Sequence, residues 1–125
     1  MITHPRTEEL AEAVAAWIDQ IRPSLDPRNA FLARVAANAM ATIQRELTQG
    51  PAAEATAIAR LSDVLSHAGT YDELNAELCA RVRSGELTVE TPGLLAALRI
   101  MATDQLAIDQ PSYRPEGSRP FPAPG

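Results

Sequence analysis

The sequence predicts an all-α protein, a single-domain bundle of about five helices with an extended, proline-rich C-terminal tail. Three observations favour this fold class. Alanine, the strongest helix former, recurs throughout the 125 residues. Aromatic residues make up only 4% of the chain, and no run shows the alternating, β-branched pattern of a strand. Large apolar residues recur instead at steps of three and four, the period of an amphipathic helix.

The first two predicted helices are separated by a proline-containing break. The first begins near Thr7, whose hydroxyl is a candidate N-cap, and carries an apolar stripe of Leu10, Val14, Trp17 and Ile21. The second begins at Asp26-Pro27 and runs to Thr48. Its expected packing stripe is Leu32, Val35, Ala39, Ile43 and Leu47. Small residues at its centre allow close helix approach, so we expect it to be the central helix.

Three further helices are predicted after Gly50-Pro51. The third carries Ile58, Leu61 and Leu65 as its inward face and ends near Gly69. The fourth begins with Thr70 and Glu73 at the spacing of a capping box, carries Leu74, Leu78 and Val82 as its stripe, and stops at Gly85 as a left-handed residue. The fifth begins at Thr91-Pro92 and ends near Asp109.

The predicted domain organisation is a helical bundle over residues 1–110 and a tail over residues 111–125. From Pro111 onward, five of fifteen residues are proline and two are glycine. Such a segment is typical of an extended chain without a core of its own.

Charge and composition exclude several function classes. The net charge is −5, and no segment offers the basic stripe that nucleic-acid binding requires. The chain has no lysine, which excludes Schiff-base and P-loop lysine chemistry. No stretch is apolar enough for a membrane span, the start lacks the pattern of a signal peptide, and the single cysteine cannot form an intrachain disulfide. We therefore expect a cytoplasmic protein that binds neither nucleic acid nor membrane.

The sequence shows no catalytic, metal-binding or cofactor-binding motif. His4, His67 and Cys79 are far apart and share no ligand spacing, and a glycine-rich phosphate loop is absent. We interpret Cys79 as a small buried hydrophobe and His67 as a cap at the end of the third helix. The prediction is a protein that is not an enzyme and carries no metal or cofactor.

The most interesting polar residues lie on one flank of the second predicted helix. Arg34, Asn38 and Arg45 follow one another at steps of four and seven. In one interpretation Asn38 bonds to a neighbouring helix and the arginines are solvated. In the other, the three form an edge that binds acidic groups or phosphate.

Three segments, FLARVAANAMATIQRELTQG (31–50), LNAELCARVRSGEL (74–87) and LLAALRIMATDQLAIDQPSY (94–113), resemble a family of small bacterial proteins of unassigned function. Such proteins are typically encoded beside an aminoglycoside-phosphotransferase-like kinase and an acyl-CoA dehydrogenase. In levulinate and related 4-hydroxyacid degradation that kinase phosphorylates a hydroxyacyl-CoA, so the resemblance implies a partner role. The family often has a lysine and an Asp-Asn-Pro run where this chain has Gln105 and Asp109-Gln110-Pro111. The family's motif positions are Arg34, Asn38, Glu46, Leu47, Asn75, Leu78, Cys79, Arg83, Gly85, Asp109, Pro111 and Tyr113.

These observations lead to three hypotheses. The first is a non-catalytic accessory subunit that binds a phosphotransferase-like kinase through one face of the bundle. The second is a small acyl-CoA-binding or enzymatic bundle that uses arginines for phosphate groups. The third is a homo-oligomeric structural module. The candidate partner-binding residues are Arg34, Asn38, Arg45, Asn75, Arg83, Asp109 and Tyr113.

Overall fold

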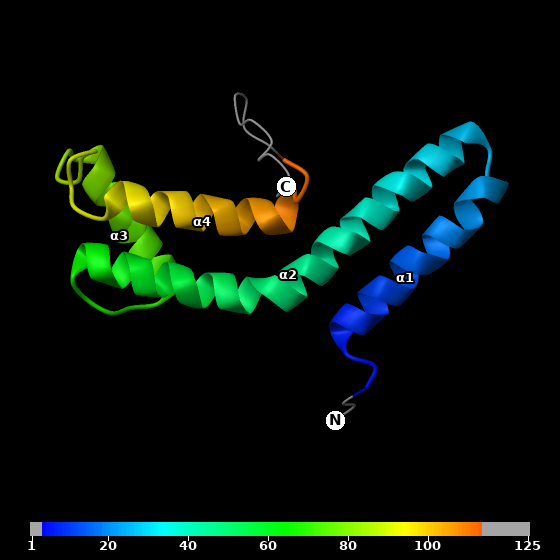
Figure 1. The fold of residues 1–125 in the computed structure, drawn as a ribbon, viewed down its shortest axis with the longest axis horizontal. Helices are drawn as coiled ribbons and strands as arrows, with labels where there is room; N and C mark the ends of the chain where they lie inside the picture. The colour runs from blue at the N-terminus through cyan, green and yellow to red at the C-terminus, as the bar shows by residue number, and fades with distance from the viewer. Residues whose placement is uncertain (1–3, 114–125) are drawn as a thin grey trace, which may run out of the picture.

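The computed structural model describes residues 4–113 as an all-helical chain without a strand in that range, which confirms the predicted fold class (Figure 1). The elements are α1 (Thr7–Ile21), the short 3-10 helix η1 (Arg22–Ser24), α2 (Pro27–Leu65), α3 (Tyr71–Arg83) and α4 (Leu94–Asp109). None of these helices combines the length and the apolar character that crossing a membrane would need. The predicted tail spans residues 111–125, and from residue 114 onward it lies outside the described range.

Residues 4–113 form four α helices rather than five, because α2 continues through Gly50-Pro51 and is 39 residues long. The predicted break at this point was wrong. Proline removes one helical N–H and crowds the carbonyl four residues earlier, which bends a helix without always ending it. Figure 1 shows α2 changing direction near its middle. Contacts with α1 before the bend and with α3 after it stabilise both halves. α2 as a whole contacts every other helix, but the segment that was predicted to be the central packing helix, its first half, lies outside the leucine core.

The predicted starts of two helices are confirmed. Thr70 Oγ1 accepts the N–H of Glu73 and Glu73 Oε2 accepts the N–H of Thr70, each at 3.2 Å, which completes the capping box before α3. Asp26 caps α2, since its carboxylate accepts both the backbone N–H and the side-chain amide of Asn29. These bonds hold the pKa of Asp26 below its usual value.

Two other predicted starts were wrong. The N-cap of α1 is Arg6 rather than Thr7, and the Arg6 N–H donates to Glu9 Oε2 at 3.0 Å. The fifth predicted helix, α4, begins at Leu94 because its N-cap is Gly93, with φ +82°. The Thr91 hydroxyl accepts the N–H of Thr88 at 2.9 Å and so closes the preceding turn instead of capping the helix.

Gly85 occupies the left-handed conformation that was predicted at the end of α3, with φ +79°. A Cβ at this position would meet no atom within 4 Å, so any effect of a substitution reports backbone strain alone. We expect Gly85→Ala to lower the free energy of unfolding by about 1–2 kcal/mol, as measured by urea denaturation. Gly85→Asn should lose less, because asparagine tolerates this conformation better; equal losses would contradict the explanation.

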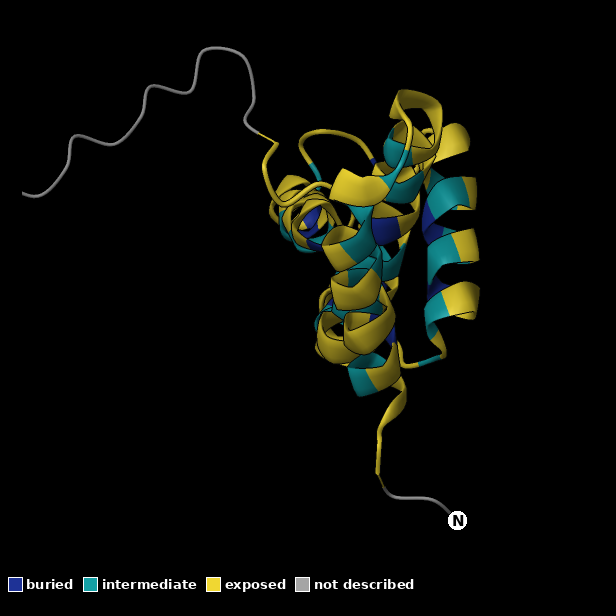
Figure 2. Ribbon diagram, turned by 90° about the vertical axis from the view of Figure 1, so that its right-hand side faces the viewer, coloured by how far each residue is buried: buried dark blue, intermediate teal, exposed yellow. Residues whose placement is uncertain are grey.

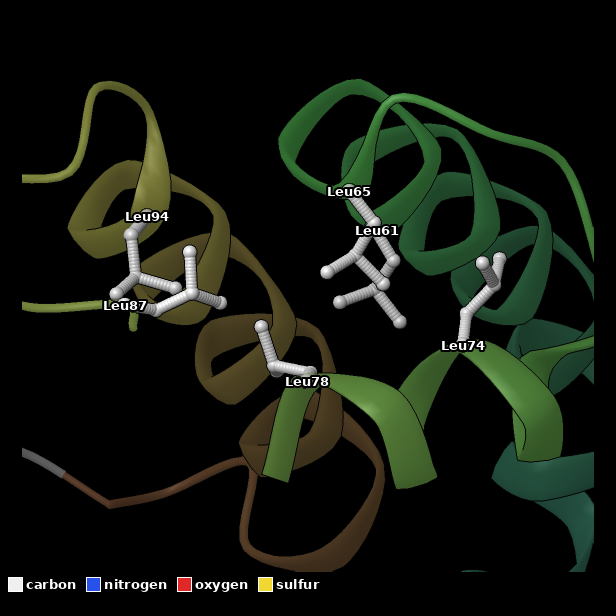
Figure 3. Packing of buried hydrophobic residues seen from close by; sticks show 6 residues of the cluster. All are labelled: Leu61, Leu65, Leu74, Leu78, Leu87 and Leu94. Atoms are coloured by element: carbon white, nitrogen blue, oxygen red, sulfur yellow. The ribbon is translucent and has the colours of Figure 1, made fainter. Parts of the chain in front are cut away.

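The core of the molecule lies between the second half of α2, α3 and the start of α4. Its centre is fully buried at Leu61 and Leu74. Figure 3 shows leucines from the three helices and the α3–α4 loop pointing toward one another. The cluster consists of Leu61, Leu65, Leu74, Leu78, Leu87 and Leu94. The predicted inward faces are therefore confirmed here, except that Val82 is 47% exposed.

The hairpin formed by α1 and the first half of α2 packs differently from the prediction. The contact runs along small residues, and only Ala11 and Ala37 are buried within it. The large residues of both predicted stripes lie mostly outside this contact. Alanine allows two helices to approach closely, so the alanines take the seam and the bulky side chains flank it. Figure 2 shows dark blue only where helices face one another, while most of the helical surface is exposed.

Candidate functional site

The three polar residues predicted on one flank of α2 have different environments. Arg45 is not solvated: its Nε donates to the carbonyl of Ile108 at 2.7 Å, and its second guanidinium nitrogen donates to Thr42 Oγ1. Asn38 is exposed, and its side chain makes no hydrogen bond to another residue of the range 4–113. The Arg34 guanidinium lies 5.9 Å from the ring centre of Phe31. The expected bond from Asn38 to a neighbouring helix is therefore absent in the described range, and Arg45 is structural.

The structure does not bring the other candidate residues together into one site. Asn75 is half-buried on α3, and Arg83 is exposed at the end of that helix. Asp109 ends α4 and accepts a hydrogen bond from the side-chain amide of Gln105 at 2.9 Å. Tyr113 follows α4, and its backbone N–H donates to the carbonyl of Gln110. Cys79, interpreted from sequence as buried, is half-buried.

The α1–α2 hairpin exposes several large apolar side chains. Seven of them each keep between 38% and 59% of their surface exposed. We call this surface the hairpin face; its residues are Leu10, Val14, Trp17, Leu32, Val35, Ile43 and Leu47. All seven residues belong to the two apolar stripes that the periodicity predicts. The stripes were expected to pack inside the bundle, and in the structure they are exposed.

Six of the seven side chains lie on the same side of the hairpin; Val35 is the exception, because it is two positions from both Ala33 and Ala37 and therefore lies about 160° around α2 from the α1 contact. Each residue advances around a helix by about 100°, and the seam positions include Ala11 and Ala15 on α1 and Ala33 and Ala37 on α2. Leu10 and Val14 precede seam positions on α1, as Leu32 does on α2. In an antiparallel pair, residues one position before the seam fall on one common side. The two stripes therefore form a continuous surface rather than two separate edges.

A recess of about 390 Å³ opens on another part of the molecule, between the bend of α2, the start of α3 and α4. Four carboxylates and no basic residue are among its lining side chains: Glu46, Glu54, Asp72 and Asp104. Within residues 4–113 no group of three acidic, histidine or cysteine residues is placed to hold a metal ion. Sequence analysis did not find the recess, since these residues come from three helices and share no local motif.

A polar network joins the end of α2 to α3. The imidazole of His67 bonds to the Ala68 carbonyl through Nδ1 and to Glu77 through Nε2. Glu77 also accepts a hydrogen bond from Arg81 at 3.1 Å. The bond to the Ala68 carbonyl and the bond to Glu77 raise the pKa of His67, and the bond from His67 lowers the pKa of Glu77. His67 thus connects two helices. The prediction that it caps a helix end was wrong.

The His67–Glu77 pair predicts a pH-dependent contribution to stability. The pKa of His67 is raised above 6.5, so its contribution is complete below pH 6.5 and is lost as pH rises through the folded-state pKa. The pKa of Glu77 is lowered below 4.5, so its contribution is complete above pH 4.5 and is lost on further acidification. The two contributions therefore coincide between pH 4.5 and pH 6.5.

The measurement is the difference in free energy of unfolding between the wild type and His67→Gln across pH. Glutamine retains hydrogen-bonding groups but does not titrate. We expect the free energy of unfolding of the wild type to exceed that of His67→Gln most between pH 4.5 and pH 6.5, and this difference to shrink at alkaline pH. A difference that is constant with pH would show that the pair does not titrate as the geometry indicates.

Comparison with known proteins places the chain in a family. The sequence profile of a domain of unknown function (DUF6285) matches residues 23–113. The chain belongs to this family. No curated protein and no solved structure matches it.

The DUF6285 match covers α2, α3, α4 and the acidic recess, whereas α1 lies outside the matched range. Four of the seven residues of the hairpin face are therefore within the DUF6285 region, namely Leu32, Val35, Ile43 and Leu47.

Proposed function

We propose that this DUF6285 protein is a non-catalytic, cytoplasmic partner subunit that works by binding another protein chain. The observation that carries the proposal is the hairpin face. Its seven large apolar side chains each keep 38% to 59% of their surface exposed, whereas monomers rarely expose contiguous apolar patches larger than a few hundred Å². Contiguous apolar surfaces of this kind commonly mark interaction sites.

A protein surface fits the hairpin face better than a lipid surface does. Helices that lie on membranes combine an apolar face with basic residues. Residues 7–48 carry six acidic and four basic residues, a net charge of −2, so the hairpin lacks the basic excess that anionic lipid headgroups attract. A protein partner can cover apolar side chains without this requirement.

The resemblance described above makes a phosphotransferase-like kinase the first partner to test. In this proposal the small subunit stabilises a hydroxyacyl-CoA kinase or completes its substrate site. Direct acyl-CoA binding is less compatible with the recess, because its four carboxylates would repel the phosphates of CoA.

Co-expression of the chain with a phosphotransferase-like kinase of the kind that the resemblance implies, followed by affinity purification, tests the proposal. We expect the two proteins to purify together and the kinase to gain solubility or activity over the kinase expressed alone. A kinase that is fully soluble and active alone, and that forms no complex with this chain, would overturn the proposal.

A further inference from the structure

The α1–α2 hairpin lacks a core of its own. Among the elements of residues 4–113, α1 contacts only η1 and α2, and no third helix packs on α1. The only buried side chains in residues 7–48 are Ala11 and Ala37. Two antiparallel helices bury little apolar surface between them, whereas four helices can enclose a core. The hairpin therefore resembles two helices of a four-helix bundle. The apolar side chains that would form the core of such a bundle are exposed as the hairpin face.

We propose that the hairpin face is covered by a second copy of this chain, so that two hairpins pack face to face as an intermolecular four-helix bundle. The inference rests on the proposed function in one respect, namely that the hairpin face binds protein. It goes beyond the proposed function in naming the occupant, and it leaves α3, α4 and the acidic recess free for another partner.

The apolar character of the hairpin face suits this occupant. A stable interface buries about 800 Å² on each partner, with an apolar core and a polar rim. The exposed apolar side chains of the hairpin face provide that core, and the neighbouring polar residues of α1 and α2 provide the rim. The face is formed equally by two antiparallel helices, so a two-fold axis parallel to them can bring the same patch of both copies into contact.

Charge complementarity favours the same arrangement. α1 carries four acidic residues and no basic one, a net charge of −4, whereas residues 27–48 of α2 carry three arginines and one glutamate, a net charge of +2. With the two-fold axis parallel to the helices, the acidic α1 of each copy lies over the basic half of α2 in the other. Residues 1–49 together carry only −1, so two copies do not repel, while residues 50–125 carry −4.

The test uses the full-length protein, first without any partner. Light scattering across a concentration series is expected to give twice the 13.4 kDa mass of one chain. Trp17 is the single tryptophan and is 59% exposed in one copy, so its fluorescence should shift to the blue as the concentration rises. A monomer at about 100 μM, or tryptophan emission that does not change with concentration, would overturn the proposal.

A matched pair of variants locates the interface. Val14, on the hairpin face, is 44% exposed and Val82, on α3, is 47% exposed, and both are helical valines. Val14→Glu places an unpaired charge in the interface twice, once per copy, and should raise the dimer Kd at least about 100-fold. Val82→Glu should leave the Kd unchanged, and circular dichroism should show both variants folded. A dimer that both variants weaken equally, or that neither weakens, would contradict the proposed face.

The same measurements separate this inference from the proposed function. A chain that stays monomeric alone and buries Trp17 only when the kinase is added would assign the hairpin face to the kinase. That result overturns the second copy as occupant and supports the accessory role. A dimer that never binds the kinase would support the present inference and overturn the accessory role.

Discussion

Leu61→Ala is expected to lower the free energy of unfolding by about 2–5 kcal/mol, the largest single-residue effect on stability that the structure predicts. Leu61 is 0% exposed and lies within the six-leucine cluster of α2, α3 and α4. Removing its side chain leaves a cavity among groups that cannot all relax into it. Since small domains are stable by only about 5–15 kcal/mol, this variant should unfold at a clearly lower urea concentration.

Leu95→Ala is the matched control for that experiment. Leu95 lies on α4 and is 54% exposed, so its truncation should change the free energy of unfolding by less than about 0.5 kcal/mol. Urea titrations followed by circular dichroism at the helical band compare the two variants directly. Equal losses from Leu61→Ala and Leu95→Ala would show that the leucine cluster is not the centre of the fold.

Sequence reasoning succeeded where the deciding interaction is local. The capping box of Thr70 and Glu73 and the Asp26 N-cap were predicted correctly, because each bond joins residues three positions apart. The left-handed Gly85 was predicted for the same reason. At Gly50-Pro51 the local signal favoured a helix end, but contacts with α1 and α3 on either side of the bend kept α2 continuous.

The apolar stripes show a second kind of failure. Periodicity gives the angular position of Leu10 or Leu32 on its own helix, but it does not say which surface a neighbouring helix covers. In the structure the close contact between α1 and α2 buries Ala11 and Ala37 instead. The large side chains were then left exposed, and residues predicted to be core became the surface on which the proposed function depends.

The polar candidates could not be ranked from sequence, because their partners are distant along the chain. Arg45 bonds to Ile108, 63 positions away, and no local pattern indicates such a contact. Arg34 and Asn38 share the same flank of α2 but have no equivalent partner on α4. The acidic recess was missed for the same reason, since Glu46, Asp72 and Asp104 meet only in the folded chain.

Arg45→Met is expected to lower the free energy of unfolding by about 1.5–3 kcal/mol, the range measured for hydrogen bonds to charged groups. The Arg45 Nε–H satisfies the carbonyl of Ile108 in the last turn of α4, where carbonyls lack helical partners. Ile108 is 1% exposed, so that end of α4 is held against α2. Methionine keeps the length of the aliphatic stem and removes only the donors.

Arg34→Met is the control, because Arg34 lies on the same flank of α2 but is exposed, and its guanidinium lies over the ring of Phe31 in the same helix. It should change the free energy of unfolding by less than about 0.5 kcal/mol. Hydrogen exchange of the last-turn amides of α4 should speed up in Arg45→Met and not in Arg34→Met. If both variants keep wild-type stability and exchange, Arg45 does not hold α4, and its guanidinium returns to the set of groups available for an anionic ligand.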